Sequence, residues 1–254
     1  MRTDVMKTYF AIMVLSLGAS TAKAQHEHMH DMQAAEQHEE HAMGAMNVGK
    51  VMLDKLEAGD DDTQRWDAQI WVSQIWDGGD RDRLWLKSEG ERADDHTENA
   101  ELQALYSRAI SPFFDLQAGA RHDFRPTSRD WLAIGVQGLA PYFFETEATL
   151  FVGEAGRSAL RLKASYDLRF TQRLILAPEL ELNAYGEDDA DTGVGSGLSD
   201  LEFGLRLRYE IAREFAPYIG AVWTHQYGDT ADFTRTEGGD ANDVQWVAGV
   251  RLWF

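Results

Sequence analysis

The sequence predicts an all-β fold: a transmembrane antiparallel up-and-down β-barrel of about 12 strands, preceded by a disordered arm rich in Met and His. Three observations lead to this prediction. Apolar and charged residues alternate with a period of two, the alternating segments are about ten to twelve residues long, and the chain ends in such a segment. A tilted strand needs about 9–11 residues to cross a membrane, whereas globular strands average about five or six, so the lengths favour a barrel over a soluble β-sandwich.

Residues 1–24 are expected to be an export signal. Arg2 and Lys7 flank the start of the chain, residues 9–17 form a short apolar core, and residues 22–24 (Ala-Lys-Ala) supply a small-x-small cleavage site. The apolar core is too short to span about 30 Å of hydrocarbon, which makes a membrane anchor the weaker interpretation. We therefore expect the mature chain to begin at Gln25.

Residues 25–47 form the arm. The segment contains no aromatic and no branched apolar side chain, so it cannot bury a core. It holds five of the eight His and four of the eight Met of the chain, and no Met follows Met52. Because compositional arguments are weak alone, a solvated polar leader with incidental His and Met is the alternative. The candidate metal ligands are His26, His28, Met29, His30, Met32, His38, His41, Met43 and Met46.

The side chains of the arm favour copper among the metals that proteins bind. Thioether sulfur is soft and neutral and selects Cu(I), whereas imidazole binds Cu(II), Cu(I), Zn(II) and Ni(II) alike. The chain has no Cys, which excludes thiolate sites and disulfides. Removal of the signal, whose net charge is +2, takes the formal charge from −19 to −21. This charge favours cations as partners and argues against nucleic acid.

The barrel is expected to occupy residues 48–254. Its clearest strand is 160–169, where Leu, Leu, Ala, Tyr and Leu alternate with Arg, Lys, Ser, Asp and Arg, and the same alternation recurs in 174–185, 201–209 and 243–254. Counting back from the C-terminus to Trp66 gives eleven spans, and residues 48–58 supply a weak twelfth, with ten strands as the fallback. Pairing of the last strand with the first would leave no backbone edge in lipid.

Connections and aromatic residues also fit a barrel of the bacterial outer membrane. Short connections are expected at 111–112, 140–141, 170–172 and 211–214, and long ones at 91–99, 186–197 and 228–242; short turns lie on the periplasmic side of such barrels. Aromatic residues near strand ends are expected to form the interfacial girdles. They are Trp66, Trp71, Trp76, Trp85, Trp131, Tyr142, Phe143, Phe144, Trp223, Trp246 and Trp253.

The barrel interior is expected to be charged. Facing acids and bases would form salt-bridge ladders across the lumen, because buried ionic groups usually satisfy one another. The competing interpretation is a cation path through the lumen in which Glu145, Glu147, Glu179 and Glu181 bind the passing ion. The inward charges are Asp115, Arg121, Asp123, Glu145, Glu147, Arg161, Lys163, Asp167, Glu179, Glu181, Glu202, Arg206 and Arg208.

The sequence does not predict an enzyme. Barrel hydrolases need a Ser or acid constellation with a His near the rim, and neither Ser128 nor Ser165 has an adjacent His at a recognisable spacing. His96 lies in an acidic loop and could touch metal at the outer mouth, whereas His122 and His225 are expected to be girdle or strand-end residues.

Long continuous segments of the barrel resemble the copper resistance protein B family of outer membrane barrels. The family's Met- and His-rich arm before the barrel is also present, although it looks shorter here than in many relatives. The segments that carry the resemblance are LWLKSEGE (84–91), GVQGLAPYFFETEATLFVGEAGRSALRLKASYDLRFTQRLILAPELELNAYGEDD (135–189), GLSDLEFGLRLRYEIAREFAPYIGAVW (197–223), YGDTA (227–231) and VAGVRLWF (247–254).

This resemblance implies a role in copper tolerance. We expect copper ions to be bound by the arm in the periplasm and moved across the outer membrane; the direction of movement does not follow. Outer membrane lipid and copper are the expected partners, and a periplasmic copper-handling protein is a further one. The alternative function is a general diffusion porin with an incidental metal-binding leader, since the interior of any such barrel is polar.

Overall fold

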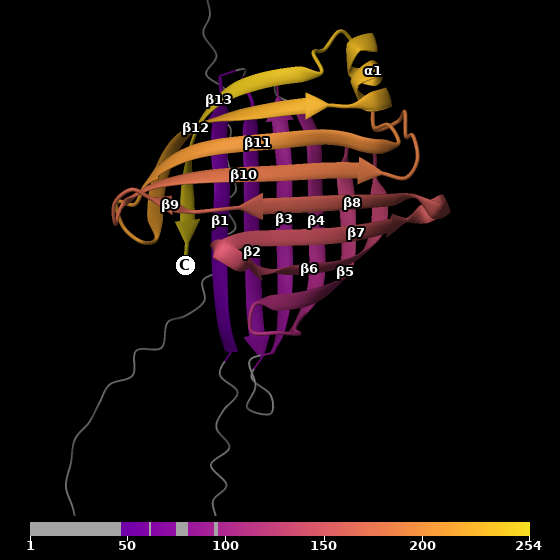
Figure 1. Ribbon diagram of the computed structural model, residues 1–254. Helices are drawn as coiled ribbons and strands as arrows, with labels where there is room; N and C mark the ends of the chain where they lie inside the picture. The colour runs from indigo at the N-terminus through magenta and orange to yellow at the C-terminus, as the bar shows by residue number, and fades with distance from the viewer. Residues whose placement is uncertain (1–46, 61, 75–80, 94–95) are drawn as a thin grey trace, which may run out of the picture. The chain divides into compact units, whose positions relative to one another are not determined.

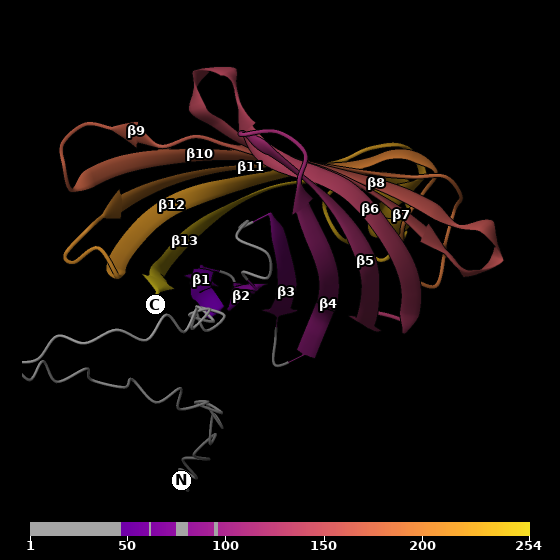
Figure 2. The same cartoon turned by 90° about the horizontal axis from the view of Figure 1, so that it is seen from below.

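The computed structural model describes residues 47–60, 62–74, 81–93 and 96–254. This part of the chain is a closed antiparallel barrel (Figures 1 and 2). The sheet contains 13 strands in 12 positions, because the short β9 continues the line of β8 and both pair with β10. The strands are β1 (Asn47–Gly59), β2 (Gln64–Gln74), β3 (Asp82–Ala93), β4 (His96–Ala109), β5 (Phe114–Arg125), β6 (Arg129–Ala140), β7 (Phe144–Gly153), β8 (Ser158–Ser165), β9 (Leu168–Arg169), β10 (Leu174–Tyr185), β11 (Gly197–Tyr209), β12 (Phe215–Gln226) and β13 (Asn242–Trp253).

The barrel closes between its first and last strands, as the C-terminal alternation predicts. β13 pairs with both β12 and β1, and the Val51 amide donates to the Phe254 carbonyl over 3.0 Å while the Phe254 amide donates to the Val51 carbonyl over 2.8 Å. In Figure 1 the strands β1 to β5 run nearly upright behind β6 to β12, which cross in front of them. This crossing reflects the tilt that closing a sheet into a barrel requires.

β1 contains a bulge that weakens its alternation in the sequence. Leu53 pairs with Leu252 and Leu56 with Val250, so Asp54 and Lys55 together oppose one residue of β13. A bulge of this kind inserts an extra residue and re-aims side chains. Both Asp54 and Lys55 consequently reach ion-pair partners in the lumen.

Side chains alternate between the two faces of the wall as period two predicts. Outward apolar residues such as Leu132 and Ile219 are 70% and 64% exposed, which is appropriate for a surface covered by lipid. Inward residues of the same two strands, such as Trp131, Ala133 and Val222, are buried, and inward polar residues of other strands, such as Gln103 and Gln117, are buried as well. Within the described residues, no α-helix is long and apolar enough to cross a membrane.

Four of the expected girdle residues lie on the inward face instead, and one of them is Trp253, which pairs directly with the inward Met52. Trp71 and Trp85 pack against each other with ring centroids 6.2 Å apart, and Trp131 donates from Nε1 to Asp123 over 2.8 Å. Trp85 and Trp131 belong to a buried cluster with Leu105 and Phe151 on the inner wall. Position near a strand end therefore does not make an aromatic residue interfacial, because the parity of its position decides which face it occupies. Trp76 lies outside the described residues.

The connections confirm two of the three expected long loops. Residues 186–196 separate β10 from β11, and residues 227–241, which contain the helix α1 (Gly228–Thr236), separate β12 from β13. Both lie at the rim opposite the strand ends that carry the termini of the barrel, and we call it the long-loop rim (Figure 1). The expected long loop at 91–99 is wrong: Glu91 pairs with Asn99 and Ala93 with His96, so the hairpin continues as polar strands.

Candidate functional site

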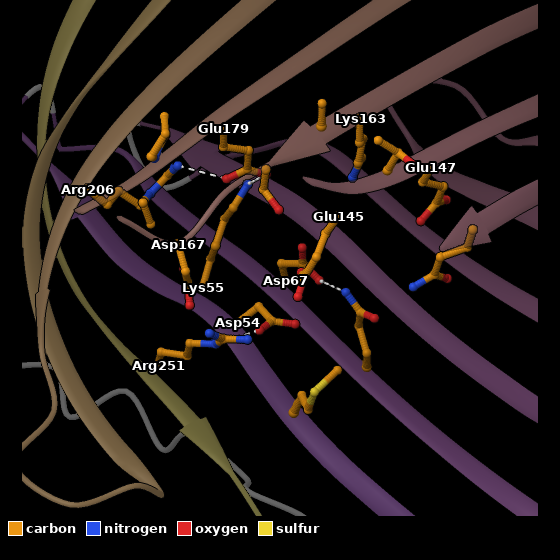
Figure 3. A pocket seen from close by; sticks show the side chains of 18 of the residues that line it. Asp54, Lys55, Asp67, Glu145, Glu147, Lys163, Asp167, Glu179, Arg206 and Arg251 are labelled. Carbon is orange, nitrogen blue, oxygen red and sulfur yellow. Dashed lines mark hydrogen bonds and ion pairs between the residues drawn. The ribbon is translucent and has the colours of Figure 1, made fainter. Parts of the chain in front are cut away.

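The lumen holds ion pairs that join strands on different sides of the barrel. Lys55 on β1 donates to Glu179 on β10 over 2.8 Å, and the Arg206 guanidinium on β11 contacts both Glu179 and Glu57 at 2.9 Å (Figure 3). Tyr218 on β12 also donates from its hydroxyl to Glu57 over 3.1 Å. The contacts of Lys55 and Glu57 join strands that are not neighbours in the sheet, whereas Arg206 and Glu179 lie on the neighbouring strands β11 and β10.

A second group of pairs connects β8 with β3 and β4. Lys163 contacts Glu89 at 2.7 Å, and Arg161 contacts Glu101 at 2.8 Å. Glu181 on β10 lies 3.3 Å from Arg161 and 3.4 Å from Lys163. Alternation correctly predicts that Arg161, Lys163 and Glu181 face inward, but Glu89, the partner of Lys163, lies 74 residues away in the sequence.

Glu147 is held by a lysine that the sequence reading missed. Lys87 on β3 donates from Nζ to Glu147 over 2.7 Å and to the Gln137 amide oxygen over 3.2 Å. The Lys87 side chain is only 2% exposed. The inward orientation of Lys87 was readable from the alternation of β3, since Trp85, Lys87 and Glu89 occupy positions of the same parity.

A cavity of about 470 Å³ lies between these pairs in the lumen (Figure 3). Glu145, Glu147 and Glu179 line it, whereas Glu181 is not among its lining residues. A second cavity of about 360 Å³ shares Glu145 and Asp167 with the first and includes Phe143, from the turn after β6, and Arg169, the last residue of β9. Glu145 therefore lies where the lumen opens toward the rim that carries the barrel termini.

Two acids of the larger cavity lack an ion-pair partner. Neither Glu145 nor Asp67 has a basic group within ion-pair distance among the described residues, and Asp67 accepts one hydrogen bond, from Gln69 at 3.3 Å. Asp67 is 7% exposed, whereas Glu145 is exposed. Figure 3 shows both carboxylates at the cavity. A cation entering from the rim that carries the barrel termini would meet these two carboxyl groups without an ion-pair partner, whereas Glu147 and Glu179 already contact lysine or arginine.

Met52 brings a soft donor to the same cavity. It lies on the inward face of β1 and packs against the Trp85 cluster. A neutral thioether binds Cu(I) better than carboxylate oxygen does, whereas carboxylates suit harder or hydrated cations. The cavity thus combines one soft donor with two unpaired hard donors, Glu145 and Asp67.

The long-loop rim is stabilised by a separate cluster. Arg129 donates to both oxygens of Asp189 at 3.1 and 2.9 Å, and Arg157 contacts Asp189 at 3.3 Å. The backbone amide of Ser196 donates to Asp188 over 2.6 Å and so holds the pKa of that carboxyl below its usual range. These contacts tie the 186–196 loop to the ends of β6 and β8.

The structure describes three His residues, His96, His122 and His225, but not the candidate ligands of the arm. His225 stacks on Trp223 with centroids 5.9 Å apart, as expected for a strand-end residue, and His96 is exposed at the start of β4. No group of three or more His, Asp or Glu side chains in the described residues is arranged to hold a metal ion. The nine candidate ligands from His26 to Met46 all lie outside the described residues.

Comparison with known proteins identifies relatives over the same region. Residues 47–254 match the family model described as Copper resistance protein B precursor (CopB). Copper resistance protein B from Escherichia coli is 52% identical over 206 residues, which cover 80% of this chain and 69% of that protein. A Copper resistance protein B homolog from Pseudomonas syringae pv. tomato is 51% identical, with the same coverage of both chains. Among solved structures, the NanC porin has 12% identity and a TM-score of 0.47, covering 81% of this chain and 99% of the porin.

Proposed function

We propose, since this chain belongs to the copper resistance protein B family, that it confers copper resistance at the outer membrane by capturing copper on its arm and passing it to the lumen. The family establishes the role in copper resistance and the barrel accounts for the outer membrane location. The division into a signal (1–24), a copper-binding arm (25–47) and a barrel (48–254) is part of the proposal. So is the placement of the arm in the periplasm.

The observation that supports copper capture by the arm is the confinement of soft ligands to one stretch of sequence. Every Met expected in the mature chain lies between Met29 and Met52, and His26 to His41 are interspersed with the first of them. Thioethers suit Cu(I) and imidazoles accept both oxidation states, so the mixture can hold copper without thiolates. Copper is cargo here, and the arm is joined directly to the start of β1.

The ion pairs in the lumen leave fewer candidate residues for a cation path than the four glutamates named from the sequence. Glu147 and Glu179 pair with lysine or arginine at 2.9 Å or less, and Glu181 lies between two basic groups, so these three acids serve the wall. Glu145 and Asp67 have no such partner and share their cavity with Met52. We assign the first contacts of a cation in the lumen to these three residues.

Copper content measured with and without the arm tests this proposal. The full mature protein and a variant lacking residues 25–47 are folded in detergent, loaded with copper under reducing or oxidising conditions, and analysed after gel filtration. A length-matched control keeps the arm but replaces its His by Gln and its Met by Leu. Both variants should lose most of the bound copper while the barrel stays folded; full copper retention in either would refute capture by the arm.

Conductance in planar bilayers addresses the porin alternative. Ion pairs that cross the lumen, such as Arg161–Glu101 and Lys163–Glu89, narrow the interior that an open porin would keep free. The proposed copper protein should give small or no steady conductance steps. Large steady steps in the variant lacking residues 25–47 and in the full chain alike would favour general diffusion.

A further inference from the structure

Three side chains at the ends of β5 and β6 form a serine–histidine–aspartate constellation. Ser128 Oγ lies 3.5 Å from His122 Nε2, and His122 Nδ1 lies 2.6 Å from Asp130 Oδ1. His122 and Asp130 are directly paired in the sheet, and Ser128 occupies the turn between them. The expectation that Ser128 has no adjacent His was therefore wrong: the hairpin brings together residues six positions apart, a spacing that no local motif signals.

The constellation faces the outside of the barrel at the long-loop rim. Asp123 and Trp131, the chain neighbours of His122 and Asp130, are buried on the inner face. The outward positions next to them are Phe124, which meets the His122 ring edge to face at 4.6 Å, and Leu132. Apolar wall and exposed polar groups thus meet at this point, where the lipid surface gives way to water.

The turn that carries Ser128 is held in place by neighbouring loops. Thr127 donates from its hydroxyl to the Asp191 carbonyl over 3.2 Å, and Arg129 makes its paired contact with Asp189 on the following position. The backbone amides of Thr127 and Ser128 make no hydrogen bond to any group in the described part of the chain. Two free amides beside a nucleophile are the donors that an oxyanion needs.

We propose that Ser128, His122 and Asp130 form an esterase site that acts on carboxylic esters with long acyl chains at the outer membrane surface. With Nδ1–H donated to Asp130, His122 Nε2 accepts the Ser128 proton as Oγ bonds to the ester carbonyl carbon. The protonated imidazole then returns that proton to the leaving alkoxide as the carbon–alkoxide bond breaks. Water, deprotonated by the same nitrogen, releases the carboxylic acid and restores Ser128.

The substrate class follows from the surroundings of the site. Phe124 and Leu132 are more than half exposed on the outward face and would contact an acyl chain that lies along the wall. The polar groups lie at the end of the hairpin, so an ester linkage at the level of lipid headgroups would reach Ser128. This site lies on the opposite face of the wall from the lumen. The esterase proposal therefore does not depend on copper transfer.

Labelling with a fluorescent fluorophosphonate tests the nucleophile directly. The full chain is purified from a host that lacks its own outer membrane phospholipase and is reconstituted in phospholipid vesicles. The wild-type protein should be labelled, and Ser128→Ala should abolish the label. Ser196→Ala is the matched control, because Ser196 is an exposed loop serine at the same rim without a His contact among the described residues. An unlabelled wild type, or a label that survives in Ser128→Ala, would overturn the proposal.

Hydrolysis of p-nitrophenyl palmitate, with p-nitrophenyl acetate for comparison, tests the base and the acyl preference. His122→Gln should lower the palmitate rate by about a hundredfold or more. Asp130 is a positioning residue, so Asp130→Asn should lower kcat with little change in KM, and Asp130→Glu should recover part of the loss. Unchanged heat-modifiable migration in gels verifies that each variant is folded. A rate that is equal in wild type and His122→Gln, or no preference for the long chain, would contradict the assignment.

Discussion

Glu147→Gln should destabilise the barrel, while Glu145→Gln two residues away should not. Removing the Glu147 charge leaves the Lys87 ammonium 2% exposed without its partner at 2.7 Å. Breaking one partner of a buried ion pair costs about 3–5 kcal/mol. Lys87 keeps its hydrogen bond to Gln137 at 3.2 Å, so we expect about 3 kcal/mol, which is roughly a hundredfold in the unfolding equilibrium.

Urea unfolding in detergent micelles, followed by tryptophan fluorescence and by heat-modifiable gel migration, measures this difference. Glu145→Gln is the matched control on the same face of β7, and it should change stability by about 0.5 kcal/mol or less because no ionic partner is stranded. Lys87→Met combined with Glu147→Gln should recover much of the loss, since no unpaired charge remains. Equal destabilisation by Glu145→Gln and Glu147→Gln would refute the division between paired and unpaired acids.

Three further outcomes follow from other parts of the molecule. Phe254→Asp places a charge beside the seam of β1 and β13 at the lipid interface. The variant should accumulate outside the membrane, which fractionation and heat-modifiable gel migration would detect. Normal insertion would show that the last residue is dispensable for closure. Glu145→Gln with Asp67→Asn should alter cellular copper accumulation and tolerance without loss of arm copper; unchanged copper handling would refute their assignment as the first contacts of a cation in the lumen. Arg129→Gln removes the paired contact with Asp189 and should make the 186–196 loop more sensitive to limited proteolysis, while unaltered cleavage would show that Arg157 suffices.

Period two in the sequence predicted the faces of the strands well. The segments 160–169, 174–185 and 201–209 present their leucines outward and their charges inward as expected, because side chains on a strand alternate strictly. The first strand was harder to recognise, since the bulge at Asp54 and Lys55 puts two consecutive charges inside. A bulge of this kind cannot be recognised from the alternation of apolar and charged residues alone.

Partners in the lumen could not be predicted from the same pattern. Lys55 and Glu179 are 124 positions apart, and which inward residues meet across a barrel depends on its stagger and tilt. The tryptophans illustrate the same limit, since Trp85 and Trp131 were expected in the girdle and lie in the interior. The Ser128 constellation required the exact hairpin, because only the pairing of His122 with Asp130 brings the turn back over the imidazole.

The charge balance inside the barrel determines where a cation can be held. An acid that already contacts lysine or arginine offers little to an entering metal ion, because binding would leave the basic partner buried without its counter-charge. Glu147 and Glu179 are therefore poor binding sites for a passing cation, although they line the cavity. Glu145 and Asp67 carry no such penalty, and the Met52 thioether adds affinity for reduced copper in the same space. Since Met52 lies only six residues after Met46, the last soft ligand of the arm, the proposed transfer needs no other soft side chain between arm and lumen.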